Sequence, residues 1–342
     1  MSDEDTDRPQ CTVDGLWTYL HCPRRYELAH VQDLAAEDGA TETPRLEPLR
    51  RALCASLETG TTDPGALVDA ATDRLDAVWP DGDDRFHSHT QRRHEKRVLE
   101  ATVEAYVETV GTDHARGLER LREAADGEFV GPDRPLRAPI SLPETERNRS
   151  VAVESTVDYV TADGASLVGV RFVPTTVPLG LLRYRSSWEG DVAALFTDHF
   201  DPDAERTDPD AVGALLETAV VLEGLRELCD RLGLDERTCR YVLVSVADRS
   251  NVSVDWVGER VEASVDTVDL TEVFLDHHTF GMTHEHRNRT VENRLAETLA
   301  ALVDGEFDPT PVWDRVAADA CPDCEYAVCC ADRLSREVAF DG

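Results

Sequence analysis

Lysine is almost absent from this sequence, because Lys96 is the single lysine among 35 basic residues and arginine supplies the rest. A run of about 18 apolar residues is also missing, so we expect no helix that spans a membrane. The first five residues, MSDED, are acidic and contain no apolar segment. We therefore expect no secretory signal and a cytoplasmic protein. The length of 342 residues allows one large domain or two joined ones with a full core.

Positive charge is scarce relative to negative charge. The sequence holds 69 acidic residues against 35 basic ones, which gives a net charge of −34. The acids are spread over every segment, which is typical of a surface adapted to high salt, as in proteins of halophilic archaea; the alternative is an ordinary acidic protein. At 1 M salt the Debye length is about 3 Å, so such charge is largely screened. The acidic balance is therefore only a weak argument against DNA as a partner.

Nine cysteines, an odd number, do not indicate a set of disulfides in a chain without a secretory signal. Four of them lie within ten residues near the C-terminus: Cys321, Cys324, Cys329 and Cys330. Three ligands in one tight loop need a fourth from elsewhere, and Cys22 is the best candidate, followed by Cys11. All-cysteine ligation suits zinc or an iron–sulfur cluster. The alternative, buried free thiols, is the expectation for Cys54, Cys229 and Cys239.

Hydrophobic periodicity predicts the order of the helices and strands. Helices are expected at 12–34 with a break at Pro23, at 49–125, at 212–232 and over most of 268–303. Strands are expected at 151–159 and 167–173 as one hairpin, at 241–246, and at 252–256 and 261–265 as a second hairpin. Residues 35–46 are expected to form a loop, and 174–207 to be irregular. This order predicts an α/β or α+β fold, with both chain ends tied by one metal site.

Two motifs stand out in the sequence. The first is TYLHCPRRYEL at 18–28, and the second is GEF at 305–307 followed by Cys321-x2-Cys324-x5-Cys330. Together they resemble the iron–sulfur branch of the RecB-like nucleases in the PD-(D/E)XK superfamily. This branch includes the CRISPR-associated exonucleases and the AddB-type nucleases. The resemblance implies a [4Fe–4S] cluster held by Cys22, Cys321, Cys324 and Cys330, with Cys329 left over. It also implies a restriction-endonuclease-like central mixed sheet flanked by helices.

The domain expectation follows from the same resemblance. We expect a disordered tail at 1–10 and one RecB-like domain over 11–342. Within that domain, about 45–128 would be a helical insertion, about 136–303 the nuclease-like core, and 321–330 the cluster loop. A centre that joins Cys22 to Cys321 would close a loop of about 300 residues and, by analogy with other cross-links, stabilise the fold by about 5–6 kcal/mol.

The catalytic positions depart from the family pattern. The family places an aspartate on one strand and an acid-x-lysine motif on the next, so that two carboxylates bind Mg²⁺ and the lysine orients the attacking water. Asp158 stands where the aspartate and metal ligand belongs, Gly169 where the second acid belongs, and Arg171 where the lysine belongs. Glycine cannot bind a metal, and arginine stays charged, so Arg171 would serve only as a fixed charge. The upstream histidine of the family falls near Cys54.

Two hypotheses about catalysis follow. In the first, which we favour, the chain keeps the fold and the cluster but has lost hydrolysis. In the second, Glu58, Glu154 or Glu217 completes a Mg²⁺ or Mn²⁺ site with Asp158. Glu154 lies four residues before Asp158 on the same strand face and could approach a shared ion, whereas its alternative is a solvated surface acid.

The resemblance implies a protein that acts on or binds DNA in repair, recombination or CRISPR-type processing, with Mg²⁺-dependent phosphodiester hydrolysis if it is active. A helicase or another repair or CRISPR protein would be its partner. The alternatives are an inactive DNA-binding or scaffold protein on the same fold, and a zinc-stabilised interaction module. Arg24, Arg25 and two groups of histidines and arginines, at 85–94 and 277–289, are candidates for contacts with DNA phosphates.

Overall fold

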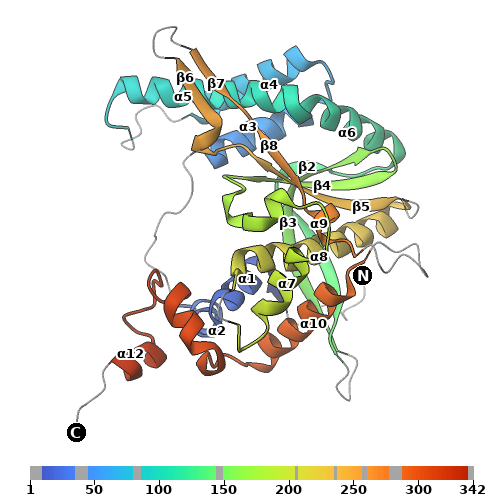
Figure 1. Cartoon of the computed structure of the whole chain (residues 1–342). Helices are drawn as coiled ribbons and strands as arrows, with labels where there is room; N and C mark the ends of the chain where they lie inside the picture. Colours follow the sequence, from blue (N-terminus) through green and yellow to red (C-terminus); the bar gives the residue numbers. More distant parts are fainter. Residues whose placement is uncertain are drawn as a thin grey trace.

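The computed structural model has the mixed α/β architecture that the sequence predicts, with a six-stranded mixed sheet and helices on both of its faces (Figure 1). It describes residues 10–34, 45–79, 86–143, 149–204, 207–234, 237–255, 260–276 and 287–337. The loop expected at 35–46 and the histidine group that begins at 277 lie almost entirely outside these residues, as does the tail at 1–9.

The main sheet supplies the frame for the candidate site. Its strands are β1 (Gln10–Thr12), β2 (Val130–Ser141), β3 (Ser150–Asp163), β4 (Ser166–Val173), β5 (Thr238–Ser245) and β8 (Asp266–Asp269). The order is β1-β3-β4-β5-β8, and β2 also pairs with β3. β3 is antiparallel to β2 and β4, whereas β4 is parallel to β5, and β5 is antiparallel to β8. The parallel β4–β5 pair requires a crossover, which a long helix between them provides.

Helices cover the two faces of this sheet separately. One face carries α3 (Leu46–Glu58), α4 (Pro64–Val78), α5 (His89–Tyr106), the π-helical turn η3 (Val107–Gly111) and α6 (Thr112–Ala124). The other face carries α1 (Val13–His21), the turn η4 (Val177–Tyr184), α7 (Asp191–His199), the crossover helix α8 (Pro209–Leu232), α9 (Leu270–Phe274) and α10 (Arg289–Asp304). Figure 1 shows α3 to α6 above the sheet, and α8 with α1, α7 and α10 below it.

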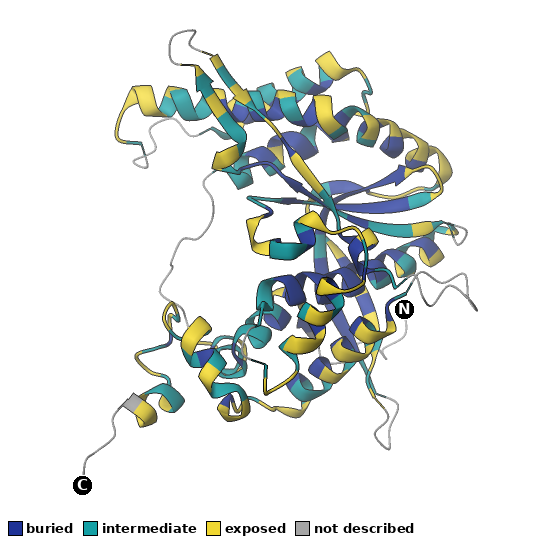
Figure 2. Ribbon diagram, in the orientation of Figure 1, coloured by how far each residue is buried: buried dark blue, intermediate teal, exposed yellow. Residues whose placement is uncertain are grey.

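The crossover helix α8 lies at the centre of the lower layer. Its residues are buried around almost the whole circumference, because the sheet covers one side while α1, α7 and α10 pack on the others (Figure 2). Its apolar character therefore reflects a place in the core of the protein. No helix of the described residues is long and apolar enough to cross a membrane.

The helices that follow α1 and the C-terminal part of the described chain lie next to each other. After α1, the chain forms α2 (Pro23–Tyr26) and the π-helical turn η2 (Glu27–Val31). The C-terminal part follows α10 and consists of η7 (Thr310–Val312), α11 (Trp313–Arg315), η8 (Val316–Ala320), the cysteine loop and α12 (Ala331–Glu337). Figure 1 shows these red C-terminal elements next to the blue helix α2.

Most long elements expected from the sequence are confirmed, and several short ones were missed. The helix break at Pro23, the β3–β4 hairpin, the strand β5 and the second hairpin of β6 (Val252–Asp255) and β7 (Arg260–Ala263) are present. The 12-residue strand β2 was not expected. Gln10 was placed in a disordered tail, but it pairs with Ala152 in the main sheet. The segment 174–207 contains the helix α7, and β8 (Asp266–Asp269) includes the first two residues of the segment 268–303 that was expected to be mostly helical.

Candidate functional site

The four cysteines expected to hold a cluster line one small cavity. Cys22 reaches it from the α1–α2 junction, and Cys321, Cys324 and Cys330 reach it from the C-terminal loop. Cys22 is buried and has an extended backbone between two helices, because Pro23 ends the hydrogen bonding of α1 and starts α2. The α1–α2 junction and the C-terminal loop therefore lie against each other at this cavity.

Consecutive turns fold the C-terminal loop around this cavity. The N–H of Cys324 donates to the carbonyl of Cys321 at 3.4 Å, and the N–H of Cys330 donates to the carbonyl of Tyr326 at 2.9 Å. The Tyr326 ring is buried, and its hydroxyl donates to the carbonyl of Leu34 at 3.0 Å. This anchors the loop to the segment that follows η2.

Ion pairs fasten the same two segments together. Arg25 reaches Glu325 at 2.9 Å, and Arg24 reaches Asp332 of α12 at 2.6 Å. Arg333 donates to the carbonyl of Cys321 at 3.0 Å. All three arginines line the cavity with the cysteines, and two of them are neutralised by the ion pairs with Glu325 and Asp332.

The donor set fits a zinc ion or an iron–sulfur cluster, since thiolates are the ligands that both prefer. Burial raises the pKa of Cys22 to about 11, so a bound cation would be needed to keep this thiol ionised at neutral pH. Among the described residues, no three His, Cys, Asp or Glu side chains already stand together as a metal group. Cys330 lines the cavity, whereas Cys329 is exposed and donates to the carbonyl of Tyr326.

Asp158 lies on β3 and is completely buried against α3. One carboxylate oxygen, Oδ1, accepts a hydrogen bond from Nε of Arg50 at 2.8 Å, and the other, Oδ2, accepts from the backbone N–H of Phe172 at 2.6 Å. Burial raises the pKa of Asp158, and the Arg50 charge and the Phe172 N–H oppose this rise. Both oxygens that would face a metal ion are thus occupied by the protein itself.

A second carboxylate helps to hold Arg50 in place. The pairing of β2 with β3 shifts between Val130 and Arg134, and Asp133 in this bulge adopts a left-handed conformation with φ 59°. Its Oδ1 lies 2.6 Å from Nη2 of Arg50. The guanidinium therefore bridges two carboxylates at the place where the family resemblance implies a divalent cation.

Arg171 lies on β4 but points to the other face of the sheet. Its Nη1 pairs with Oε1 of Glu217 on α8 at 2.7 Å. Glu217 also accepts hydrogen bonds from Trp17 Nε1 at 3.1 Å and from the Tyr241 hydroxyl at 2.5 Å. Glu217 raises the pKa of Arg171 above its ordinary value. Since α3 and α8 cover opposite faces, the structure does not bring Arg171 to Asp158 (Figure 1).

The remaining candidates do not converge on Asp158 either. A Cβ added at Gly169 would lie 3.2 Å from Leu225 of α8, so this position is filled by packing on the far face. Glu58 is exposed at the end of α3, and Glu154 is half-buried opposite Arg137 of β2. Cys54 is buried, and its thiol contacts the carbonyl of Asp158 at 3.7 Å.

Sequence reasoning missed Arg50, Asp133, Trp17 and Tyr241. All four contact a predicted site residue or its partner, but from elements far away along the chain. The available signal was Arg50, which stands three and four residues before the apolar residues Leu53 and Cys54 and so shares their helix face. A charge on a buried helix face requires an opposite charge nearby.

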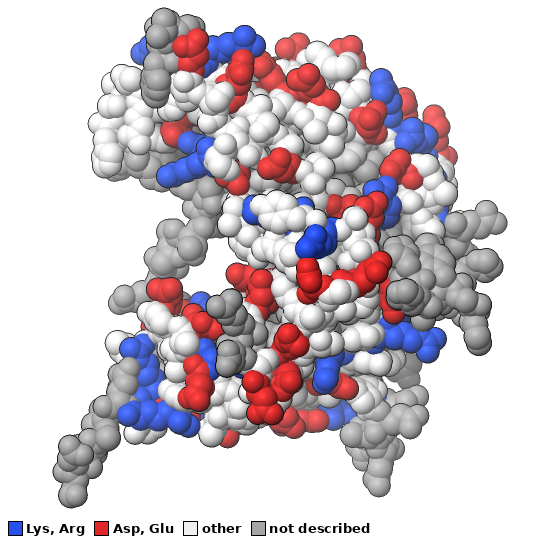
Figure 3. Space-filling model, in the orientation of Figure 1, with Lys and Arg blue, Asp and Glu red and all other residues white. Residues whose placement is uncertain are grey.

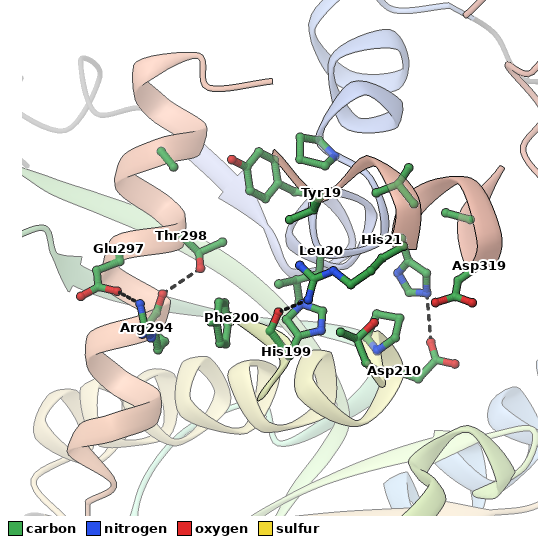
Figure 4. A pocket seen from close by; sticks show the side chains of 18 residues that line it. Tyr19, Leu20, His21, His199, Phe200, Asp210, Arg294, Glu297, Thr298 and Asp319 are labelled. Atoms are coloured by element: carbon green, nitrogen blue, oxygen red, sulfur yellow. Dashed lines mark hydrogen bonds and ion pairs between the residues drawn. The ribbon is translucent and has the colours of Figure 1, made fainter. Parts of the chain in front are cut away.

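A pocket of about 520 Å³ lies beside the cysteine cavity between α1, α8, α10 and the C-terminal segment (Figure 4). Its charged groups are paired with each other: Arg294 with Glu297 at 2.7 Å, and His21 with Asp210 at 3.3 Å. Arg315 donates to the carbonyl of His199 at 3.1 Å. The His21–Asp210 pair joins α1 to α8 and the Arg315 contact joins α11 to α7, whereas Arg294 and Glu297 both lie on α10.

A comparison with protein-family models finds no match for this chain, and a comparison with curated proteins finds no significant match. The case for a function therefore depends on the residues described above.

Proposed function

We propose that this chain is a RecB-like, PD-(D/E)XK-type protein with a [4Fe–4S] centre that binds DNA in the cytoplasm without hydrolysing it. Its role would lie in repair, recombination or CRISPR-type processing, beside a helicase or another protein of such a pathway. Cys22, Cys321, Cys324 and Cys330 would hold the cluster, whose contribution is to cross-link the two ends of the domain.

The cysteine cavity supports the family placement. A cysteine before β2 and three after β8, gathered at one place, fit the arrangement that the resemblance implies. The mixed sheet with β3 and β4 as an antiparallel hairpin, followed by α8 and the parallel strand β5, gives the candidate catalytic strands their expected adjacency.

The observation that carries the non-hydrolytic proposal is the state of Asp158. Mg²⁺ binds carboxylate oxygens that can turn toward it and leave room for water and phosphate. Here Arg50 and the Phe172 N–H bind both oxygens, and neither Gly169 nor Arg171 supplies a second group on that face. The arginine supplies the positive charge that a metal would supply in an active nuclease, but it cannot activate water.

A nicking assay tests the loss of hydrolysis. Cluster-loaded protein is incubated with supercoiled plasmid and with labelled single strands, in Mg²⁺ and in Mn²⁺, next to the Asp158→Ala variant. We expect no cleavage above that of the variant. Robust cleavage that Asp158→Ala abolishes would refute the proposal and favour a metal site completed by Glu154 or another acid.

Metal content tests the centre. The protein is purified anaerobically in high salt, and iron, sulfide and zinc are measured with the visible spectrum. We expect about four irons and four sulfides per chain and a brown colour. Cys330→Ser should lose this colour, whereas Cys329→Ser, a change at the adjacent exposed thiol, should keep it. One zinc and no sulfide would instead favour the zinc-stabilised interaction module.

A further inference from the structure

Two thiols outside the cysteine cavity contact each other. Cys229 lies in the last turn of α8, and Cys239 is the second residue of β5. Their Sγ atoms are 4.0 Å apart, and neither cysteine is in a disulfide. Both cysteines belong to the described residues, although 235–236, two of the nine residues between them, do not. The contact joins the crossover helix to the strand that follows it.

This pair differs from a thiol that only fills space in the core. Cys54 is such a thiol, since it is buried in α3 and contacts a backbone carbonyl at 3.7 Å. Cys229 and Cys239 instead place sulfur against sulfur from two different elements. A disulfide bond is about 2.05 Å long, so the two atoms need to approach by only about 2 Å to form one.

The elements that carry the two sulfurs are fixed against each other. The backbone of Cys239 is paired with Leu167 of β4. Two residues later, on the same strand face, the Tyr241 hydroxyl donates to Glu217 of α8. The sulfurs are thus held side by side, and a reaction between them is intramolecular, which gives it a high effective concentration.

Access and charge distinguish the two thiols. Cys229 is 3% exposed, whereas Cys239 is half-buried near the exposed start of β5. The hydrogen bond with Cys229 and burial raise the pKa of Cys239, and the charge of Arg226 opposes this rise. At neutral pH the pair is therefore stored as two thiols, and only the small thiolate fraction of Cys239 reacts at any time.

We propose that Cys229 and Cys239 form an oxidation site, at which a hydroperoxide converts the two thiols into a disulfide. The Cys239 thiolate attacks one oxygen of hydrogen peroxide and becomes a sulfenic acid, while the O–O bond breaks and the other oxygen takes up a proton and leaves as water. The sulfur of Cys229 then attacks that of Cys239, the S–O bond breaks, and a second water leaves with the proton of the Cys229 thiol. Two thiols and one peroxide give one disulfide and two waters. The site does not depend on DNA binding or on the proposed cluster.

Peptide mapping tests the bond directly. The full chain, as purified, is exposed to hydrogen peroxide, the remaining thiols are blocked with N-ethylmaleimide, and the protein is digested with trypsin. Cleavage after arginine releases ELCDR (227–231) and TCR (238–240), which only a disulfide can hold together. We expect this linked pair in most chains after oxidation, and its loss on treatment with dithiothreitol.

Cys229→Ser removes the thiol that closes the bond. In this variant the sulfenic acid on Cys239 should persist and be trapped by dimedone, which should label few unchanged chains. Oxidation should raise the melting temperature of the unchanged chain by about 3–6 °C, since the bond closes a loop of about ten residues. It should not raise that of Cys229→Ser, and any effect of peroxide on the cysteine cavity is common to both proteins.

Cys54→Ser is the matched control, because it removes a buried thiol that contacts a carbonyl. After oxidation it should give the linked peptides as the unchanged chain does.

Each contrary outcome refutes a definite part of the proposal. If the folded chain yields no linked peptides while the exposed Cys329 is oxidised, Cys229 and Cys239 are only packed together. If the linked peptides form only after unfolding in urea, the native arrangement does not favour the bond. If Cys229→Ser gives no dimedone adduct at Cys239, the order of attack is wrong. The plasmid and metal assays are unaffected by these outcomes, so the proposed function is judged separately.

Discussion

Arg50 lies between two carboxylates, the buried one of Asp158 and the one of Asp133. The pKa of Arg50 is raised above its ordinary value, because the two negative charges outweigh the effect of burial. Removing one partner of such a pair leaves the other charge buried without compensation. We expect Arg50→Met to lower the free energy of unfolding by about 3–5 kcal/mol at neutral pH. Urea unfolding in high salt, followed by circular dichroism, measures this change.

Arg50→Lys is the matched control, because it keeps the positive charge but not the two-sided guanidinium contact. Arg50→Lys should lower the free energy of unfolding less than Arg50→Met does. If the two variants are equally stable, the charge of Arg50 does not compensate the charge of Asp158. Arg50 would then not take the place of a metal ion beside Asp158.

His114 and His199 should make the fold sensitive to acid. Burial lowers the pKa of each to about 4, and the Nδ1 atom of His114 lies 2.6 Å from the Tyr159 hydroxyl. A histidine whose pKa is lower in the folded state binds more protons when unfolded, so its contribution is complete above the ordinary pKa and is lost as the pH falls. We expect stability to fall between about pH 6.5 and pH 4.

The contribution of His114 can be isolated by substitution. The lowering of the His114 pKa corresponds to a change of about 3 kcal/mol in the free energy of unfolding across this pH range. In His114→Gln the unfolding free energy should therefore vary less steeply with pH than in the unchanged chain. Parallel curves for the two proteins, measured by denaturant titration at each pH, would contradict the assignment.

At the scale of elements, α6 packs directly on β3 because Gly117 has no side chain. A Cβ at this position would lie 2.3 Å from Thr161 Oγ1 and 2.4 Å from the Ala162 carbonyl oxygen. Since one of these atoms is backbone, the helix must move away from the strand. We expect Gly117→Ala to cost about 1–3 kcal/mol of unfolding free energy, measured by thermal or urea denaturation.

Gly65 provides the comparison, because it is also helical but has room. Its added Cβ would meet Asp63 Oδ1 at 3.4 Å, an ordinary contact. Gly65→Ala should be neutral or stabilising by up to about 1 kcal/mol, as in other helices. If both substitutions lower the free energy of unfolding by a similar amount, the close contact of α6 with β3 is not the reason for the effect of Gly117→Ala.

Elements with regular periodicity were predictable, whereas β2 was not. The alternation at 151–159 and the turn before Ser166 gave the β3–β4 hairpin correctly. β2 contains Pro132, Pro135 and Pro139, which normally exclude a strand. They are tolerated because β2 pairs with β3 alone among the described strands, so one side of its backbone needs no N–H donors.

The cysteine cavity and the surroundings of Asp158 also differ in how far they could be predicted from the sequence. The cysteines are close together in the sequence or sit in a distinctive motif, so their grouping around one cavity could be expected. The partner of Asp158 is 108 residues away, and no local pattern connects Arg50 with it. The contact of Arg50 with Asp158 depends on tertiary packing and on a bulge in β2, and neither produces a periodic pattern in the sequence.

At the scale of the whole molecule, acidic side chains are scattered over the visible surface. Figure 3 shows acidic side chains over both layers, with arginines between them. Repulsion among these charges opposes the compact state, and it acts over about 10 Å at 0.1 M salt but only about 3 Å at 1 M. We expect the melting temperature to rise steeply with KCl over this range.

Sucrose of equal osmolality separates screening from other effects, because it does not carry charge. It should raise the melting temperature much less than KCl does. Equal shifts in the two solutes, measured by differential scanning fluorimetry, would mean that self-repulsion is not what limits stability at low salt.

The meeting of Cys22 with the loop at 321–330 also has a consequence during synthesis. The last thiol of the cavity is made about 300 residues after the first, which takes a ribosome roughly 15–60 s at about 5–20 residues per second. During that interval the three other cysteines of the cavity have not yet been made. Arg25 and Arg24 likewise lack their ion-pair partners Glu325 and Asp332. The proposed centre could therefore be assembled only after translation has passed residue 330, whatever the order in which the sheet folds.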